Sequence, residues 1–161
     1  MRKFLALSFA LIFSASAQKF DFWPGAQYDP AVPTFEKILG FTPGTKHATP
    51  EDIVRYFDAL ASAAPSRMKV FEYGRTWEGR KLIYAVISSE DNLRHLAEIK
   101  ANQMKLADPR KTSEAEAKKI MAAMPSILNL SYGVHGNEIS SPDAAMMTAY
   151  HLLASRNDQM I

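Results

Sequence analysis

The sequence predicts an α/β fold, and three features support this prediction. Segments with apolar residues at helical spacing alternate with short, continuously apolar runs, and clusters of Pro and Gly separate them. The clearest apolar run, from Leu82 to Ile87, has apolar residues on both faces, as is typical of a strand covered from both sides. Helices that alternate with such strands are characteristic of the α/β class.

The N-terminus has the pattern of a secretory signal peptide. Arg2 and Lys3 precede an apolar stretch, Phe4–Phe13, and the small residues 15–17 form a cleavage site. We therefore expect a signal peptide over residues 1–17, cleavage before Gln18, and a secreted or periplasmic protein. A membrane anchor is a weaker interpretation, because a spanning helix needs about 20 apolar residues.

The composition of the mature chain excludes several functional classes. Without the two basic residues of the signal peptide, 17 basic residues balance 17 acidic ones. This balance gives no reason to expect binding to nucleic acid or to an anionic membrane. The absence of cysteine excludes disulfides, thiolate zinc sites and cysteine nucleophiles, and agrees with a bacterial exported enzyme.

Residues 18–48 combine chain breakers with aromatic residues. We interpret them as an extended lead-in that packs its aromatic side chains against a domain, with a short helix near Thr34–Leu39. A linker is the alternative, although linkers are rarely so aromatic. The domain itself is expected to run from residue 49 to residue 161.

The first half of this domain predicts a helix and a hairpin. Thr49 resembles an N-cap with Pro50 at the first helical position, and Pro65 ends the helical pattern. Strands are expected at Met68–Tyr73 and Lys81–Ser88, joined by a turn over residues 74–79.

The second half predicts three helices and one strand. A helix is expected from Ser89 to Leu106, and Ser113 with Glu116 forms a capping-box signal for the next. Ile127–Leu130 is predicted to be a strand, buried beside Lys81–Ser88 in the same sheet. Ser141 is expected to cap the last helix, which should run to about Ser155.

His135 and Glu138 are the candidate metal ligands. They follow the predicted strand and precede the last helix, a position at the carboxyl edge of a sheet where α/β proteins bind ligands. Zinc accepts imidazole and carboxylate ligands, and Gly136 would permit the turn that brings the two side chains together. The alternative is an ordinary polar loop, since the H-x-x-E pattern alone is common.

Two motifs resemble the zinc carboxypeptidase family. Tyr73-Gly-Arg-Thr-Trp-Glu-Gly-Arg-Lys-Leu82 is similar to its G-x-S/T-x-E-G-R-x-L hairpin, and His135-Gly-Asn-Glu138 is similar to its first zinc motif. The order and separation of the motifs also fit. The resemblance implies the N-terminal part of a mixed-sheet, three-layer fold, incomplete at the C-terminus, from a large secreted bacterial member.

The same resemblance implies a zinc-dependent metallocarboxypeptidase that hydrolyses peptide or protein substrates. His135 and Glu138 would be the first two zinc ligands, whereas the third ligand and the general base are expected beyond Ile161. The chain would then be inactive alone. Asn137 stands where digestive members carry an arginine, so the resemblance leaves open the substrate contacts and the preference for a C-terminal residue.

Two other functions remain open: a zinc amidohydrolase that deacylates amino acids, and a non-enzymatic secreted binding module. The intact His135/Glu138 pair argues against the binding module.

The remaining candidate residues are expected to be structural. His151 is interpreted as a helix residue, His95 as exposed and His47 as part of a loop. Glu78 and Arg80 are expected to pair within the hairpin turn, and Trp77 to pack rather than bind substrate.

Overall fold

The computed structural model describes residues 21–157, and the predicted signal peptide lies outside them. These residues form a mixed α/β structure of helices and a small antiparallel sheet. The elements are α1 (Phe35–Leu39), α2 (Pro50–Ala63), β1 (Met68–Arg75), β2 (Lys81–Ile87), α3 (Glu90–Arg94), α4 (Leu96–Ala107), α5 (Glu114–Ala123) and α6 (Ser140–Ala154).

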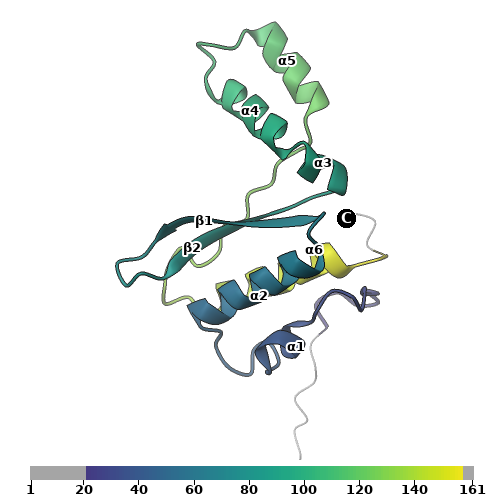
Figure 1. Ribbon diagram of the computed structural model, residues 1–161, viewed down its shortest axis with the longest axis vertical. Coiled ribbons are helices and arrows are strands. Elements are labelled where there is room, and N and C mark those ends of the chain that lie inside the picture. The colour runs from purple at the N-terminus through teal and green to yellow at the C-terminus, as the bar shows by residue number, and fades with distance from the viewer. Residues whose placement is uncertain (1–20, 158–161) are drawn as a thin grey trace, which may run out of the picture.

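The elements form a packed body and a projecting arm. In the body, α2 lies between the β1–β2 hairpin and α1, and it also packs against α6 (Figure 1). Helices α3, α4 and α5 form the arm, which stands away from the sheet (Figure 1). The candidate site lies in the loop that leads from the arm back to α6.

Helix α2 begins as the sequence predicts. Thr49 is the N-cap, and its side chain accepts a hydrogen bond from the Asp52 amide at 3.1 Å. The Asp52 carboxylate accepts one from the Thr49 amide at 3.0 Å, which completes a capping box, and Pro50 occupies the first helical position. The prediction for this helix is confirmed.

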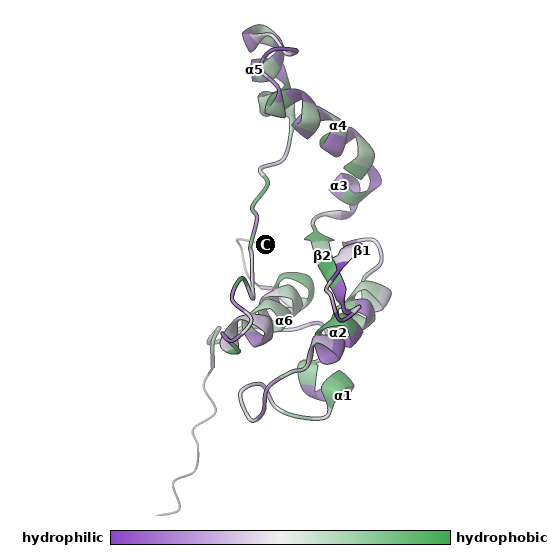
Figure 2. Cartoon of the chain, turned by 90° about the vertical axis from the view of Figure 1, so that its left-hand side faces the viewer, coloured by the Kyte–Doolittle hydropathy of each residue, from purple (hydrophilic) through white to green (hydrophobic). Residues whose placement is uncertain are grey.

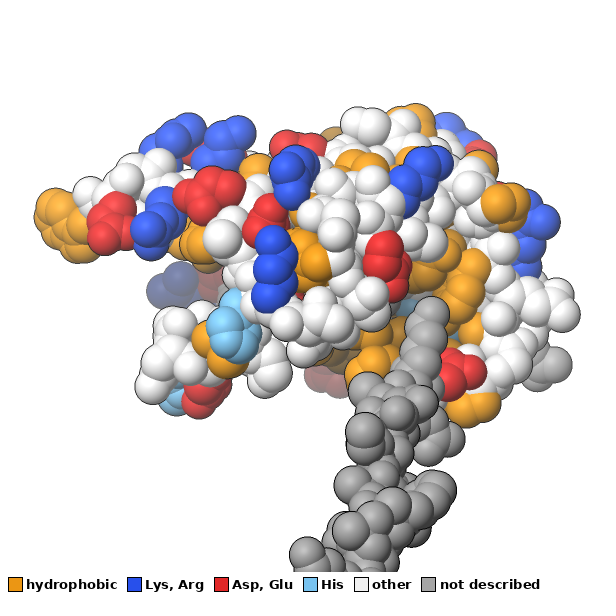
Figure 3. All heavy atoms as spheres, turned by 90° about the horizontal axis from the view of Figure 1, so that it is seen from below, with side chains coloured by type: hydrophobic (Ala, Val, Ile, Leu, Met, Phe, Trp, Pro, Cys, Tyr) orange, Lys and Arg blue, Asp and Glu red, His pale blue; other side chains and the backbone are white. Residues whose placement is uncertain are grey.

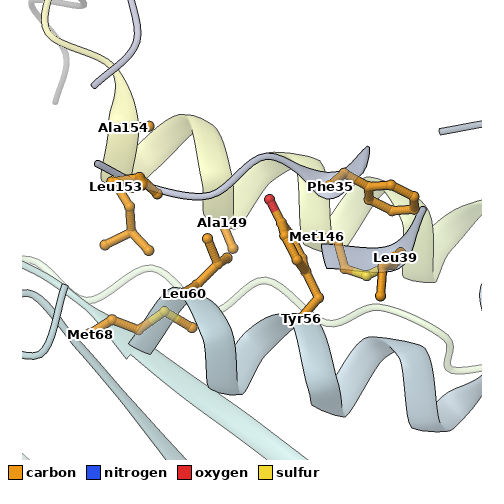
Figure 4. Close-up of a cluster of buried hydrophobic side chains, with 10 residues drawn as sticks. Phe35, Leu39, Tyr56, Leu60, Met68, Met146, Ala149, Leu153 and Ala154 are labelled. Carbon is orange, nitrogen blue, oxygen red and sulfur yellow. The ribbon is translucent and has the colours of Figure 1, made fainter. Parts of the chain in front are cut away.

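The core lies where α1, α2 and α6 meet the start of β1 (Figure 4). Tyr56 and Leu60 of α2 and Met146 of α6 are fully buried in it. The other members are Val32, Phe35, Leu39, Met68, Ala149, Leu153 and Ala154. The lead-in therefore supplies core residues, and its helix α1 lies where the sequence predicts it, with Thr34 as N-cap.

The hairpin buries one face only. Val70, Ala85 and Ile87 pack against the core, whereas Phe71 and Tyr84 stack on each other at 5.0 Å on the opposite face. The prediction that Lys81–Ser88 is a central, buried strand is wrong. Among the described residues the sheet is β1–β2 alone, so β2 has no neighbour on its second edge and stays half-exposed.

The predicted strand Ile127–Leu130 is also absent. This segment is irregular, and Leu128 is 81% exposed. Its apolar residues lie along the connection between α5 and α6, beside no other element (Figure 2). A continuous apolar run gives the tendency to form a strand, but a strand also needs an edge with which to pair, and here no described strand lies beside it. The three-layer mixed sheet implied by the family resemblance stays a prediction.

The arm departs from the predicted single helix over Ser89–Leu106. Two helices, α3 and α4, meet at His95, whose ring nitrogen Nδ1 lies 2.9 Å from the Asp91 carbonyl oxygen. The same carbonyl oxygen also accepts a hydrogen bond from the His95 amide, at 3.2 Å. The backbone of His95 departs from helical geometry, so α3 ends there. The prediction for α5 is confirmed: Ser113 caps it, and it ends before Pro125.

Helix α6 starts two residues earlier than expected. Ile139 rather than Ser141 is its N-cap, and no side chain caps it. Ser141 already has helical geometry, and Pro142 is the third helical residue rather than the first. Pro lacks an amide hydrogen, and the amides of the first helical residues have no intrahelical partner, so Pro is tolerated at any of these positions. The Ser141-Pro142 pair therefore could not show which residue begins the helix. The end at Ala154 agrees with the prediction.

Among residues 21–157, no helix is long and apolar enough to cross a membrane. Basic and acidic side chains are interspersed on the face seen from below (Figure 3).

Candidate metal centre

The structure brings the two predicted ligands together. His135 Nδ1 and Glu138 Oε1 lie 2.9 Å apart in the loop before α6. Both side chains are largely exposed, at 70% for His135 and 56% for Glu138. An imidazole nitrogen and a carboxylate oxygen therefore point at the same place in solvent, where an ion from solution can reach both.

A tight turn produces this arrangement. The Glu138 amide donates a hydrogen bond to the His135 carbonyl at 3.1 Å, which closes a turn of four residues. The left-handed backbone that favours glycine is at Gly133, with φ +69°, and not at Gly136 as the sequence suggested. Gly133 redirects the chain ahead of the pair, and the turn between the ligands needs no special residue.

A side-chain hydrogen bond joins this loop to α6. The Tyr132 hydroxyl donates a hydrogen bond to Thr148 Oγ1 at 3.3 Å. Thr148 lies in the middle of α6, so the loop is held to the helix from one side while the ligand pair stays exposed.

The two groups form a direct hydrogen bond, and their atoms are of the types that zinc accepts as ligands. Nitrogen and oxygen ligands lie about 2.0–2.2 Å from zinc, so two neighbours in a tetrahedral site are separated by roughly 3.3 Å. The observed 2.9 Å is within a few tenths of an ångström of that separation. Among the residues described, no group of three His, Cys, Asp or Glu side chains is placed to hold a metal.

The other histidines are not part of this pair. His151 is buried in α6, where its ring stacks on Trp23 at 4.1 Å, and the prediction of a structural helix residue is confirmed. His95 is exposed in the arm and His47 lies in a loop, also as predicted.

The hairpin turn gives one confirmation and one correction. Arg80 and Glu78 form an ion pair at 2.6 Å, so they pair locally as expected. The prediction that Trp77 packs is wrong, because its side chain is fully exposed at the tip of the hairpin. The turn places it beyond the end of both strands, where the body of the protein offers no surface to cover it.

Asp143 is a titratable residue that follows the candidate pair closely in the sequence. It lies in the first turn of α6, and its Oδ1 is buried without a hydrogen bond. Burial raises its pKa, while the nearby amide of Ala48 and the charge of His47 act in the opposite direction. Only tertiary contact with the loop before α2 creates this environment, so no local sequence signal could have revealed it.

Comparison with known proteins identifies the family of this chain. The sequence matches the zinc carboxypeptidase family over residues 53–161, which is more than half of the chain. The chain therefore belongs to the zinc carboxypeptidase family. Searches of curated proteins and of solved structures gave no significant match.

Proposed function

We propose that this chain carries the first two zinc ligands, His135 and Glu138, of a secreted metallocarboxypeptidase. The observation that carries the proposal is the exposed pair of ligand atoms, 2.9 Å apart, in a chain of the zinc carboxypeptidase family. The substrate class is a peptide or protein, and secretion follows from the N-terminal signal pattern.

The residues of the chain have a defined part in this chemistry. Zinc, when bound, polarises the scissile carbonyl and lowers the pKa of a bound water to about 7. His135 contributes a nitrogen donor and Glu138 an oxygen donor, and the turn between them fixes their separation before any metal arrives. The third ligand and the carboxylate base that takes the proton from water come, under this proposal, from residues beyond Ile161.

Zinc binding by residues 18–161 tests the ligand assignment. We expect weak binding, measured by competition with a chromophoric chelator, because two ligands hold the metal less well than three. Both His135→Ala and Glu138→Ala should abolish it. The matched control is His95→Ala, which removes an exposed histidine from the arm and should leave binding unchanged. Binding that survives His135→Ala would show that the ligands lie elsewhere.

Hydrolysis tests the reaction. Protein from the complete reading frame should release the C-terminal residue of a peptide, and His135→Ala should remove this activity. Residues 18–161 alone should not cleave, because the base is supplied from outside them. Efficient cleavage by residues 18–161 would contradict the assignment of the base. Activity on acylated amino acids, with none on peptides, would favour the amidohydrolase instead.

A further inference from the structure

The segment over residues 23–34, which we call the N-terminal strap, lies along the C-terminal end of α6. Its Asp29 amide donates a hydrogen bond to the Ala154 carbonyl at 2.7 Å, and the Arg156 amide donates one to the Gln27 carbonyl at 2.8 Å. Tyr28 and Ser155 form an antiparallel bridge between these bonds. The strap therefore pairs with the chain just where α6 ends, and the Asp29 amide takes up one of the carbonyl groups that a helix end leaves without an intrahelical partner.

Side chains strengthen the same contact. The Trp23 ring stacks on the His151 ring with centroids 4.1 Å apart and an angle of 8° between the planes. The Tyr28 hydroxyl lies 2.9 Å from His151 Nδ1, and Asp29 forms an ion pair with Arg156 at 3.0 Å. His151 is only 5% exposed, so the strap contributes to the burial of a polar ring that is costly to leave without partners.

The other end of the strap enters the core. Val32 is 6% exposed and belongs to the core cluster, and the Pro33 carbonyl accepts the hydroxyl hydrogen of buried Tyr56 at 3.1 Å. The strap thus joins the end of α6 to the middle of α2. It lies entirely outside residues 53–161, over which the family similarity extends.

We propose that the N-terminal strap is a permanent part of the folded unit, so that maturation must cut before Trp23 and residues 23–34 do not act as an activation peptide. Removal of the strap would take Val32 out of the core cluster, and would leave the Tyr56 hydroxyl and the Ala154 carbonyl without these partners. The strap also bears on the candidate site, because α6 starts two residues after Glu138 and carries the loop that holds the pair. The proposal does not depend on zinc binding or hydrolysis.

The two tryptophans of the chain give a matched test. Trp23→Ala removes the ring that stacks on His151, whereas Trp77→Ala removes a fully exposed ring. In the mature protein from Gln18, Trp23→Ala should accelerate hydrogen exchange of the amides in the last two turns of α6 by roughly two- to tenfold. Trp77→Ala should leave these rates unchanged. Equal rates in both variants would overturn the proposal.

The natural N-terminus gives the second test. N-terminal sequencing of the exported protein should find a start at or before Trp23. A protein that starts at Phe35, and so lacks the whole strap, should lose the cooperative thermal unfolding of the protein that starts at Gln18. An exported form that starts after residue 34 and unfolds at the same temperature as the protein that starts at Gln18 would refute the proposal. Zinc plays no part in either measurement, so failure of the proposed enzyme function would not affect the result.

Discussion

The Tyr56 hydroxyl offers a sharp test of how the lead-in is joined to the domain. Tyr56 is fully buried, and its hydroxyl donates a hydrogen bond to the Pro33 carbonyl at 3.1 Å. Tyr56→Phe keeps the ring, so it opens no large cavity, but it leaves a buried carbonyl without a donor. Such a loss costs about 1–3 kcal/mol, and we expect the free energy of unfolding to fall by this amount.

The same residue makes stability depend on alkaline pH. Burial raises the pKa of Tyr56 above its ordinary value of 10.0, and the neighbouring Tyr150 and Glu36 add to the effect. Above pH 10 the unfolded chain therefore releases a proton that the folded protein keeps. The contribution of Tyr56 to the free energy of unfolding is fully present below pH 10. As the pH rises above 10, the free energy of unfolding falls by up to about 1.4 kcal/mol per pH unit because of this group. Tyr56→Phe should remove this part of the slope.

Urea unfolding between pH 8 and pH 11, followed by tryptophan fluorescence, measures both effects. The matched control is Tyr73→Phe, which removes a hydroxyl from a side chain that is 64% exposed and should change stability little. The reasoning fails if Tyr56→Phe and Tyr73→Phe have the same free energy of unfolding at pH 8, or if their alkaline slopes are equal.

Two further predictions concern the helix start and the candidate site. Thr49→Ala removes the hydroxyl that accepts the Asp52 amide, while the Asp52 carboxylate still accepts the backbone amide of residue 49. The free energy of unfolding should fall by about 1 kcal/mol in urea titrations, whereas Ser62→Ala, at an exposed position in the same helix, should change it little. Unchanged stability in Thr49→Ala would contradict the assigned cap. Gly133→Ala forces a side chain into a left-handed conformation and should cost about 1 kcal/mol, while Gly136→Ala should cost only a few tenths. A new side chain meets no atom within 4 Å at either glycine, so thermal denaturation of the two variants compares backbone conformation alone.

The correct predictions rest on short-range interactions. Thr49 caps α2 and Ser113 caps α5 through bonds to residues only three positions away, so the local sequence contains both partners. The hairpin between β1 and β2 is similarly local, because a short turn brings its strands together. Signals of this kind need no knowledge of the rest of the fold.

The failed predictions needed long-range information. Ile127–Leu130 has the composition of a buried strand, but a strand forms only where another strand edge is placed beside it. Trp77 was expected to pack because large aromatic residues usually bury much of their surface, yet the turn projects it into solvent. In each case the residue type was interpreted correctly as apolar, and the position of its partners decided the outcome.

The candidate site depends on both short-range and long-range interactions. A turn of four residues brings His135 and Glu138 together, which is why the spacing of the motif predicts their contact. Because both side chains are exposed, this contact contributes less than about 1 kcal/mol. So weak an interaction would cost little to break if, as proposed, both groups bind a metal. A third ligand, by contrast, must come from a distant part of a chain, and no local pattern can place it. The His-x-x-Glu pair can therefore be recognised and built from four consecutive residues, while the completion of the proposed site depends on tertiary structure.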